Sequence, residues 1–306
     1  MTLRELQYLV AVADLGHFGR AAEACHVSQP TLSAQLRKLE ETLGFALVER
    51  TSRAVHVTPL GAQVVARARR MLAEAEAIRG LARRAAAPLS QPLTLGVIPT
   101  LGPYLLPWLT AAVAAAYPDL RLVVHEDQTD RLLRALADYR IDVGLMALPV
   151  AAPAGGGDGL ATLPLFDEPF LVAAPPGHPF ARLRRVEPER LAAERLLLLT
   201  DGHCLRDQAL AVCRLAAEPQ ASADFRAAGL ETLRQMVAAG MGCTLLPAMA
   251  ADAAGPSSVV VRPLAGDAGR RIGMVWRNGY DRAGDLHLLA ALIRASAPPT
   301  VTPVAA

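Results

Sequence analysis

Three short helical blocks follow one another within the first sixty residues, and this pattern constrains the fold more than any other feature of the sequence. Ser28 and Pro30 mark the start of the third block, because serine is favoured as a helix N-cap and proline in the first turn. Only residues 25–29 separate the second block from the third, which is the length needed to turn one helix across another. The sequence therefore predicts a helix-turn-helix. The apolar residues that recur at helical spacing are Leu3, Leu6, Leu9, Val10 and Ala13, then Ala21, Ala22 and Ala24, then Leu32, Leu36 and Leu39.

The segment after the third block predicts a wing and a long helix. Extended pieces at Ala46–Arg50 and Ala54–Val57 flank the polar turn of residues 51–53, as in a two-stranded wing. Helix formers then run from Thr58 to Arg84, with an apolar stripe spaced alternately by four and three residues: Val64, Ala68, Met71, Ala75, Ile78 and Ala82. Such a stripe is typical of a helix that pairs with a second copy of itself; packing on its own domain is the alternative.

The rest of the chain alternates strands with helices, which predicts a parallel α/β layout. The elements expected first are strand 93–98, helix 104–117, strand 120–126, helix 130–138 and strand 143–148. A strand-rich stretch at 169–174, a helix over 230–238 and a late strand at 272–276 indicate two lobes, with the chain returning to the first. Ligand sites in such folds lie at the carboxyl ends of strands.

Three parts are therefore expected. Residues 1–58 form an all-α winged helix-turn-helix domain, residues 59–87 a linker and dimerisation helix, and residues 88–306 a two-lobed α/β domain.

Hydropathy, cysteine content and charge exclude several classes of protein. No apolar stretch is long enough to span a bilayer, and Arg4, Glu5 and Asp14 interrupt the apolar run that a secretory signal would need, so we expect a cytoplasmic protein with no membrane partner. The four cysteines are not expected to be permanent disulfides, and with no CxxC pair and seven scattered histidines no metal is expected. Residues 1–90 hold twelve basic and eight acidic residues, which is compatible with a nucleic-acid partner.

Several motifs identify a family. The stretches FGRAAEACHVSQPTLSAQLRKLEETLG, LVER and VTPLG resemble the N-terminal domain of LysR-type transcriptional regulators, and the chain to about residue 295 resembles their periplasmic-binding-protein-like effector domain. The stretches IPTLGPYLLP, HEDQT, DGHCLRDQALAVC and LETLRQMVAAG resemble the hydrogen-peroxide-sensing members of that family. The resemblance implies an activator of oxidative-stress genes rather than an enzyme, without a cofactor, in which homodimers assemble into a homotetramer.

The third block carries the side chains expected to read DNA. Short polar groups at a helix N-terminus reach base edges, and Gln29 is suited to adenine, whereas cations contact phosphates. A dimer would require a two-fold related operator. The expected contact residues are Ser28, Gln29, Pro30, Thr31, Ser33, Arg37, Lys38, Arg50 and Arg53.

By the resemblance, Cys204 and Cys213 form the redox-active pair. Thiols react as thiolates, so His203, Arg206 and the start of a helix are expected to lower the pKa of the Cys204 thiol. Cys213 is expected to be buried and slow, and to condense with a sulfenic acid formed on Cys204. Nine helical residues span roughly 13 Å, whereas a disulfide tolerates at most about 7 Å between Cα atoms, so the bridge must disrupt the helix.

The resemblance also assigns a peroxide pocket and a polymerase contact. Thr100, Thr129, His203, Arg206 and Asp207 are expected to line the pocket, with helix capping as the alternative for either threonine. RNA polymerase is expected to contact Asp142 and Arg277. The sequence departs from the family at Asp224, where peroxide sensors often have histidine.

Three other functions compete with peroxide sensing. A LysR-type regulator could bind a small organic effector between the lobes, with incidental cysteines. A thiol peroxidase would turn over at Cys204 with Cys213 as the resolving thiol, but would not need the DNA-binding segment. A transport-associated binding protein would share the lobes but carry an export signal.

Overall fold

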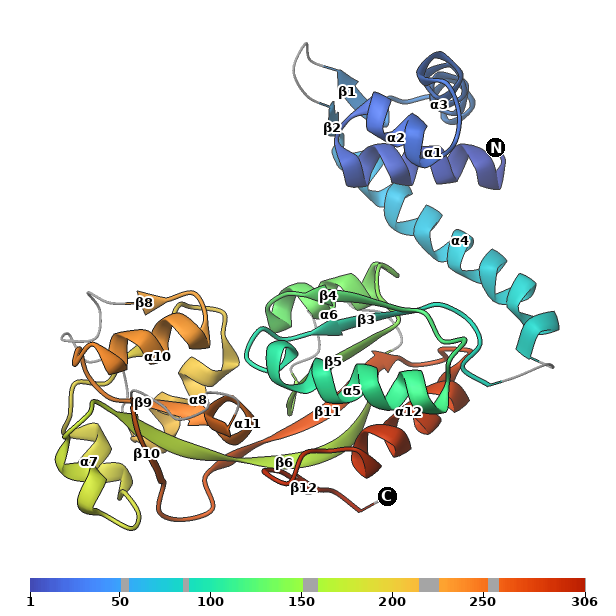
Figure 1. The fold of residues 1–306 in the computed structure, drawn as a ribbon. Helices are drawn as coiled ribbons and strands as arrows, with labels where there is room; N and C mark the ends of the chain where they lie inside the picture. Colours follow the sequence, from blue (N-terminus) through green and yellow to red (C-terminus); the bar gives the residue numbers. More distant parts are fainter. Residues whose placement is uncertain (51–54, 85–87, 151–158, 215–225, 253–258, 306) are drawn as a thin grey trace. The chain divides into compact units, whose positions relative to one another are not determined.

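A computed structural model describes residues 1–50, 55–84, 88–150, 159–214, 226–252 and 259–305 (Figure 1). The chain divides into two compact units, residues 1–87 and residues 88–306 apart from 138–140, and each is considered by itself. In the part of the chain that is described, no helix has both the length and the apolar character needed to cross a membrane.

The first unit contains the predicted helix-turn-helix and wing. Ser28 caps the third helix, its hydroxyl oxygen accepting a bond from Thr31 N at 3.3 Å. Leu9, Leu32 and Leu36 are completely buried where the three helices meet. The two strands pair antiparallel, Val48 opposite Val57. The elements are α1 (Leu3–Leu15), α2 (Phe18–Ala24), α3 (Gln29–Leu43), β1 (Val48–Arg50), β2 (Val55–Val57) and α4 (Pro59–Arg84).

The start of α4 is fixed against the segment before the wing. Thr58 caps the helix, since its hydroxyl oxygen accepts a bond from Gly61 N at 2.9 Å and its O–H donates to Ala46 O at 2.9 Å. A side chain at Gly61 would place its Cβ 2.1 Å from Leu47 O. Leu47 cannot retreat easily, because it is fully buried and its N–H donates to Glu40 Oε1 at 2.8 Å. Glycine is therefore required where the helix crosses the segment that contains Leu47.

The predicted apolar stripe of α4 has two different environments. Val65, just beside the stripe, and Ala68, within it, are buried in the core of the first unit, and Arg69 forms an ion pair with Asp14 of α1. Farther along, Met71 and Ile78 are 45% and 68% exposed. The early part of the stripe thus packs on its own domain, as the alternative interpretation proposed, whereas Met71 and Ile78 are exposed; the side chain of Ala82 lies outside the described residues.

In the second unit, the first lobe is built on parallel strands but its sheet is mixed. Strands β4, β3 and β5 lie parallel, whereas β11 (Gly269–Arg277) pairs antiparallel with both β5 and β6 (Leu160–Ala174). The expected parallel layout is therefore present in these three strands of the first lobe and in the pair β7 (Leu198–Leu199) and β8 (Arg226–Ala227) of the second, but not in the described strands that pair with β6. Helices α5 and α12 lie side by side in this lobe (Figure 1). Its elements are β3 (Leu93–Val97), α5 (Gly102–Ala116), β4 (Leu122–Glu126), α6 (Thr129–Ala137), β5 (Val143–Leu148), α12 (Ala283–Ala295) and β12 (Thr302–Pro303).

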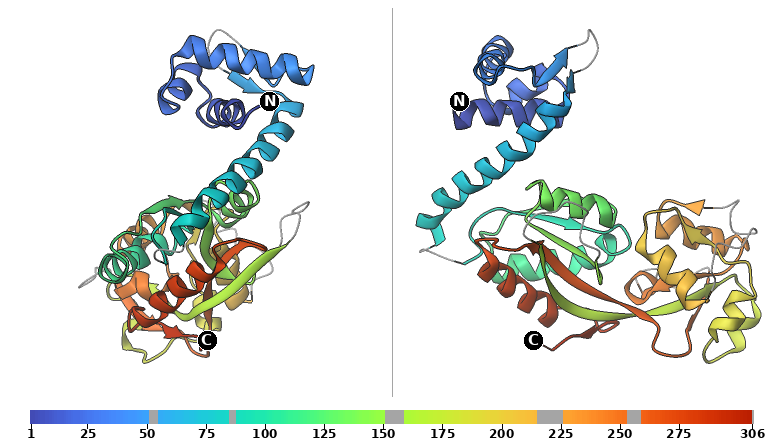
Figure 2. Two further views of the ribbon diagram at one scale, coloured as in Figure 1. Left: turned by 90° about the vertical axis from the view of Figure 1, so that its right-hand side faces the viewer. Right: turned by 180° about the vertical axis from the view of Figure 1, so that it is seen from behind.

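Two long strands connect the lobes. Strand β6 (Leu160–Ala174) pairs with β11 (Gly269–Arg277) in the first lobe and with β9 and β10 in the second, and β11 returns the chain to the first lobe (Figure 2). Each lobe has its own hydrophobic core. The second lobe contains η1 (Pro179–Arg182), α7 (Pro188–Ala192), β7 (Leu198–Leu199), α8 (Cys204–Val212), β8 (Arg226–Ala227), α10 (Leu230–Ala238), β9 (Thr244–Pro247), α11 (Ala248–Asp252) and β10 (Val260–Pro263).

The contact at Gly61 gives a stability prediction. Gly61→Ala should lower the free energy of unfolding of the first unit by about 2 kcal/mol, because the added methyl group overlaps a fixed backbone oxygen. Urea denaturation followed by helical circular dichroism measures the loss. The exposed neighbour Ala62 is the control, and Ala62→Ser should change stability by less than about 0.5 kcal/mol. Equal stability of Gly61→Ala and the parent would refute the close contact.

Candidate functional site

The exposed face of α3 presents the polar residues expected to contact DNA. Its opposite face carries Leu32, Leu36 and Leu39, all fully buried, so the helix has one side free for a ligand. The hydroxyl oxygens of Ser28 and Thr31 lie 2.7 Å apart. Arg53 lies outside the described residues, as does the side chain of Arg50. The remaining expected residues are exposed or, for Ser33, half-buried: Ser28, Gln29, Pro30, Thr31, Ser33, Arg37 and Lys38.

The two expected redox cysteines lie at opposite ends of α8. Cys204 is the first helical residue, and it packs against the core of the first lobe although α8 belongs to the second. Cys213 caps the other end and is buried in the core of the second lobe. Both sulfur atoms are free thiols. A helix of this length separates the two Cα atoms by roughly 13 Å, beyond the reach of a disulfide.

The electrostatics around Cys204 differ from the sequence-based expectation. Burial raises the pKa of the Cys204 thiol. The charge of Arg270, a hydrogen bond with Thr129 and backbone hydrogen bonds at Cys204 and Leu205, at the expected helix start, act in the opposite direction. His203 was expected to act as a cation, but burial lowers its pKa and favours the neutral ring. Arg206 forms ion pairs with Asp201 and Asp207, each at 3.3 Å. The cation that stabilises the thiolate is thus Arg270, and the expectation that His203 and Arg206 do so is wrong.

Arg270 is held by a buried network that joins the connecting strands to the first lobe. Its Nε–H donates to Glu168 Oε2 at 2.8 Å, and both side chains are fully buried. Its Nη groups donate to the hydroxyl oxygen and the carbonyl oxygen of Thr100 at 2.7 and 2.9 Å. Glu168 Oε1 also accepts a bond from Met249 N at 2.9 Å. The position of the guanidinium is therefore determined on several sides.

The network assigns roles to the expected pocket residues. Thr100 is buried and its hydroxyl oxygen accepts a bond from Arg270, whereas Thr129, at the start of α6, bonds to the Cys204 thiol. His203 is buried immediately before α8. Asp207 is an exposed carboxylate paired with Arg206, on the solvent side of α8. Thr100 thus contacts Arg270, Thr129 contacts Cys204, and His203 precedes Cys204 in the chain, whereas the Asp207 side chain is exposed.

Sequence reasoning missed three residues of this site. Arg270 and Glu168 are distant from Cys204 along the chain and stand in stretches without a recognisable motif. Gln208 lies one helical turn after Cys204, and its Oε1 is buried without a hydrogen-bond partner among the described residues. A repeat of one turn places it on the same face of α8 as Cys204, a signal that helical spacing contained.

Asp142 and Arg277, the expected polymerase contacts, make bonds inside the first lobe. Asp142 accepts a bond from Thr94 N at 2.7 Å. Arg277 donates to Leu136 O and to Ile141 O, each at 2.7 Å. Arg277 therefore ties the end of α6 to the segment before β5, and Asp142 ties that segment to β3.

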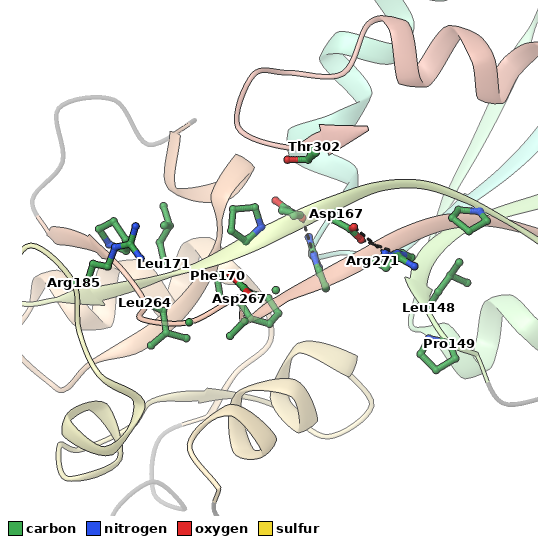
Figure 3. Close-up of a pocket in the computed structure, with 18 of the residues that line it drawn as sticks. Leu148, Pro149, Asp167, Phe170, Leu171, Arg185, Leu264, Asp267, Arg271 and Thr302 are labelled. Carbon is green, nitrogen blue, oxygen red and sulfur yellow. Dashed lines mark hydrogen bonds and ion pairs between the residues drawn. The ribbon is translucent and has the colours of Figure 1, made fainter. Parts of the chain in front are cut away.

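A separate cavity lies beside the two connecting strands (Figure 3). It has a volume of about 1200 Å³ and contains the ion pair between Asp167 and Arg271, whose N···O distances are 2.7 and 2.9 Å. Leu148 and Pro149 line it from the first lobe, and Arg185 from the second. Cys204 is not among the described residues that line this cavity.

Within the described part of the chain, no three His, Cys, Asp or Glu side chains are placed to hold a metal ion.

Comparison with known proteins identifies both units. Residues 3–62 match the model of bacterial regulatory helix-turn-helix proteins of the lysR family, and residues 86–298 match the LysR substrate binding domain. The Escherichia coli K12 DNA-binding transcriptional dual regulator OxyR is 45% identical over 297 residues, which cover 96% of this chain and 95% of that protein.

Solved structures give the same result. A full-length OxyR variant from Pseudomonas aeruginosa matches with a TM-score of 0.83 and 38% identity over 100% of this chain and 98% of that one. A hydrogen-peroxide-bound OxyR mutant from Corynebacterium glutamicum matches with a TM-score of 0.63 and 39% identity over 96% and 92% of the two chains. From its helix-turn-helix and from these matches, the chain belongs to the LysR family of bacterial transcriptional regulators.

Proposed function

We propose that the chain is a DNA-binding transcriptional activator of oxidative-stress genes that senses hydrogen peroxide through a reversible disulfide between Cys204 and Cys213. The observation that carries the proposal is the placement of α8, with Cys204 against one core and Cys213 in the other. The relatives named OxyR or hydrogen peroxide-inducible genes activator support it. So does the peroxide-bound structure from Corynebacterium glutamicum.

The chemistry takes place in two steps. The Cys204 thiolate attacks one oxygen of hydrogen peroxide, the O–O bond breaks, and the leaving hydroxide takes a proton to become water, which leaves a sulfenic acid. The Cys213 thiolate then attacks that sulfur, the S–OH bond breaks, and a second water leaves as the disulfide forms. The protein loses two electrons in total, and an external dithiol restores them.

The residues around Cys204 support the first step. Arg270 stabilises the thiolate, and the Thr129 hydroxyl bonds to the sulfur. The Oε1 atom of Gln208 offers an acceptor for a peroxide O–H. Thr100 and neutral His203 complete the pocket, while Arg206 and Asp207 hold the start of α8 from its solvent side.

The second step requires α8 to reorganise. Because the helix keeps the two sulfur atoms apart, closing the disulfide must disrupt residues between Cys204 and Cys213. Cys204 then leaves its contacts with the first lobe. The two lobes therefore adopt one arrangement in the reduced form and another in the disulfide form. The assembly of the regulator on DNA changes with this arrangement.

The first unit supplies the DNA contacts. The exposed polar residues at the start of α3 read base edges, and Arg37, Lys38, Arg50 and Arg53 contact phosphates.

The exposed apolar face of α4 around Met71 and Ile78 joins two copies, and the two-lobed domains join homodimers into a homotetramer. Asp142 and Arg277 contact RNA polymerase through the exposed parts of their side chains. Since its operator is genomic DNA, the protein acts in the cytoplasm.

A regulator that binds a small organic effector is the second candidate function. The cavity beside the connecting strands favours it, because its volume fits a small molecule and its lining combines apolar side chains with the Asp167–Arg271 pair. In that case operator binding would respond to a metabolite and ignore peroxide.

Mapping disulfides before and after micromolar peroxide tests the proposed function. The parent chain should form the Cys204–Cys213 bridge, and amide exchange over residues 205–212 should accelerate. Cys204→Ser should abolish the response, whereas Cys213→Ser should stop at the sulfenic acid with the helix still protected. Peroxide consumption with a thiol reductant should stay close to stoichiometric; sustained turnover would indicate a peroxidase, and oxidation of Cys213 first would refute the scheme.

The charge of Arg270 predicts a pH dependence. Because Arg270 favours the thiolate, Arg270→Gln should raise the pKa of the Cys204 thiol further. The midpoint of the rate–pH profile should move to higher pH, and the rate at neutral pH should fall about tenfold. Stopped-flow oxidation by peroxide measures both. Arg271→Gln is the matched control one residue away and should leave the profile unchanged; a profile unmoved by Arg270→Gln would rule out its role.

Operator binding provides a third test. Thr31→Ala should weaken specific binding by roughly 1–3 kcal/mol while leaving redox behaviour intact, because the side chain is exposed and its backbone N–H keeps the Ser28 cap. Arg37→Ala should instead weaken binding to all sequences and flatten the salt dependence. Fluorescence anisotropy with operator and unrelated duplexes distinguishes them, and equal affinity of Thr31→Ala and parent for the operator would contradict the assignment.

A further inference from the structure

A side chain of the first lobe contacts the segment that leads into α8 from the second lobe. Gln128 lies between β4 and α6, and its Nε2 donates to Asp201 O at 3.1 Å. Thr129, the next residue, bonds to the Cys204 thiol. Two consecutive residues of one lobe thus contact both ends of the short segment Asp201–Cys204 of the other.

The shape of that segment fits the Gln128 side chain. Gly202 has a φ of +90°, and a Cβ built there would lie 2.5 Å from Gln128 Oε1 and 2.8 Å from its Cδ. The glycine therefore permits the amide to lie directly on the backbone. Gln128 itself is fixed at its base, because its N–H donates to Asp127 Oδ1 at 2.8 Å.

The position of Cys213 determines when this contact exists. Cys213 is buried in the second-lobe core at the far end of α8, so Cys204 must leave the first lobe to reach it. The residues before Cys204 are joined to it by only a few peptide bonds and move with it. The Gln128 contact is therefore made in the reduced form and lost in the disulfide form.

We propose that Gln128 is a positioning residue of the redox switch, a latch that holds the segment Asp201–Cys204 on the first lobe and stabilises the reduced form against the disulfide. The inference rests on the proposed function, since it concerns the same pair of cysteines. A contact present in only one of two states shifts the equilibrium by its own free energy. One exposed neutral hydrogen bond corresponds to a shift on the order of fivefold.

The latch acts on the second step of oxidation and not on the first. Gln128 bonds to the backbone of Asp201 and is not among the groups that shift the pKa of the Cys204 thiol. Its removal should leave the rate of sulfenic acid formation unchanged and make the disulfide easier to form. This separation distinguishes a latch from a general loss of structure, which would alter both steps.

The test is the redox equilibrium of the full-length chain in mixtures of reduced and oxidised dithiothreitol, with alkylation and mass spectrometry measuring the Cys204–Cys213 disulfide. Gln128→Ala should require about a fivefold higher ratio of reduced to oxidised dithiothreitol at the midpoint. Gln128→Glu keeps the size of the side chain but removes the donor, and it should shift the midpoint in the same direction. Arg134→Gln, which removes an exposed bond to Asp130 O within α6, is the control and should not shift it.

Each outcome bears on one claim. In a Cys213→Ser background, Gln128→Ala should form the sulfenic acid at the parent rate. A disulfide that forms at the parent midpoint in Gln128→Ala would overturn the latch and leave the proposed function intact, as would a parent-like midpoint in Gln128→Glu. Absence of any Cys204–Cys213 disulfide in the parent chain would overturn both.

Discussion

The ion pair between Arg270 and Glu168 is the interaction on which the sensory unit depends. Two charged groups with no solvent exposure are tolerated only when they are paired and fully hydrogen-bonded. Glu168 on β6 pairs with the Arg270 guanidinium, and Thr100 of the first lobe accepts a further bond from it. The N–H of Met249 in α11 donates to the Glu168 carboxylate. The pair therefore fixes the junction of the lobes at the same time as it places a cation near Cys204.

This arrangement explains how a buried thiol can react selectively. Burial alone favours the protonated, unreactive form, which protects Cys204 from general oxidants. The nearby guanidinium and the Thr129 hydroxyl favour the thiolate, so reactivity depends on groups that are oriented toward one small site. Cys243 shows the contrast: burial and the charge of Glu194 raise the pKa of its thiol to about 12, which leaves it inert.

The sequence predicted what local signals determine. The Ser28 cap, the strand at 143–148 and the helix at 230–238 follow from capping and periodicity, and the structure confirms them. The direction of β11 is set by pairing with strands distant in the sequence, so the mixed sheet was not predictable from alternation. Likewise, proximity in sequence suggested His203 and Arg206 as activating cations, whereas burial neutralises the first and the acidic partners Asp201 and Asp207 hold the second.

The placement of α8 across two cores has a consequence for timing. Peroxide is destroyed when it is detected, so the regulator cannot remain in equilibrium with its signal as a ligand-binding protein does. Instead, the information is retained in a covalent bond, and in the proposed scheme that bond changes the structure by drawing Cys204 away from the first core toward Cys213 in the second. The duration of the response is then a property of the cell's reductants, and the protein acts as a short-term chemical memory of an exposure that has already ended.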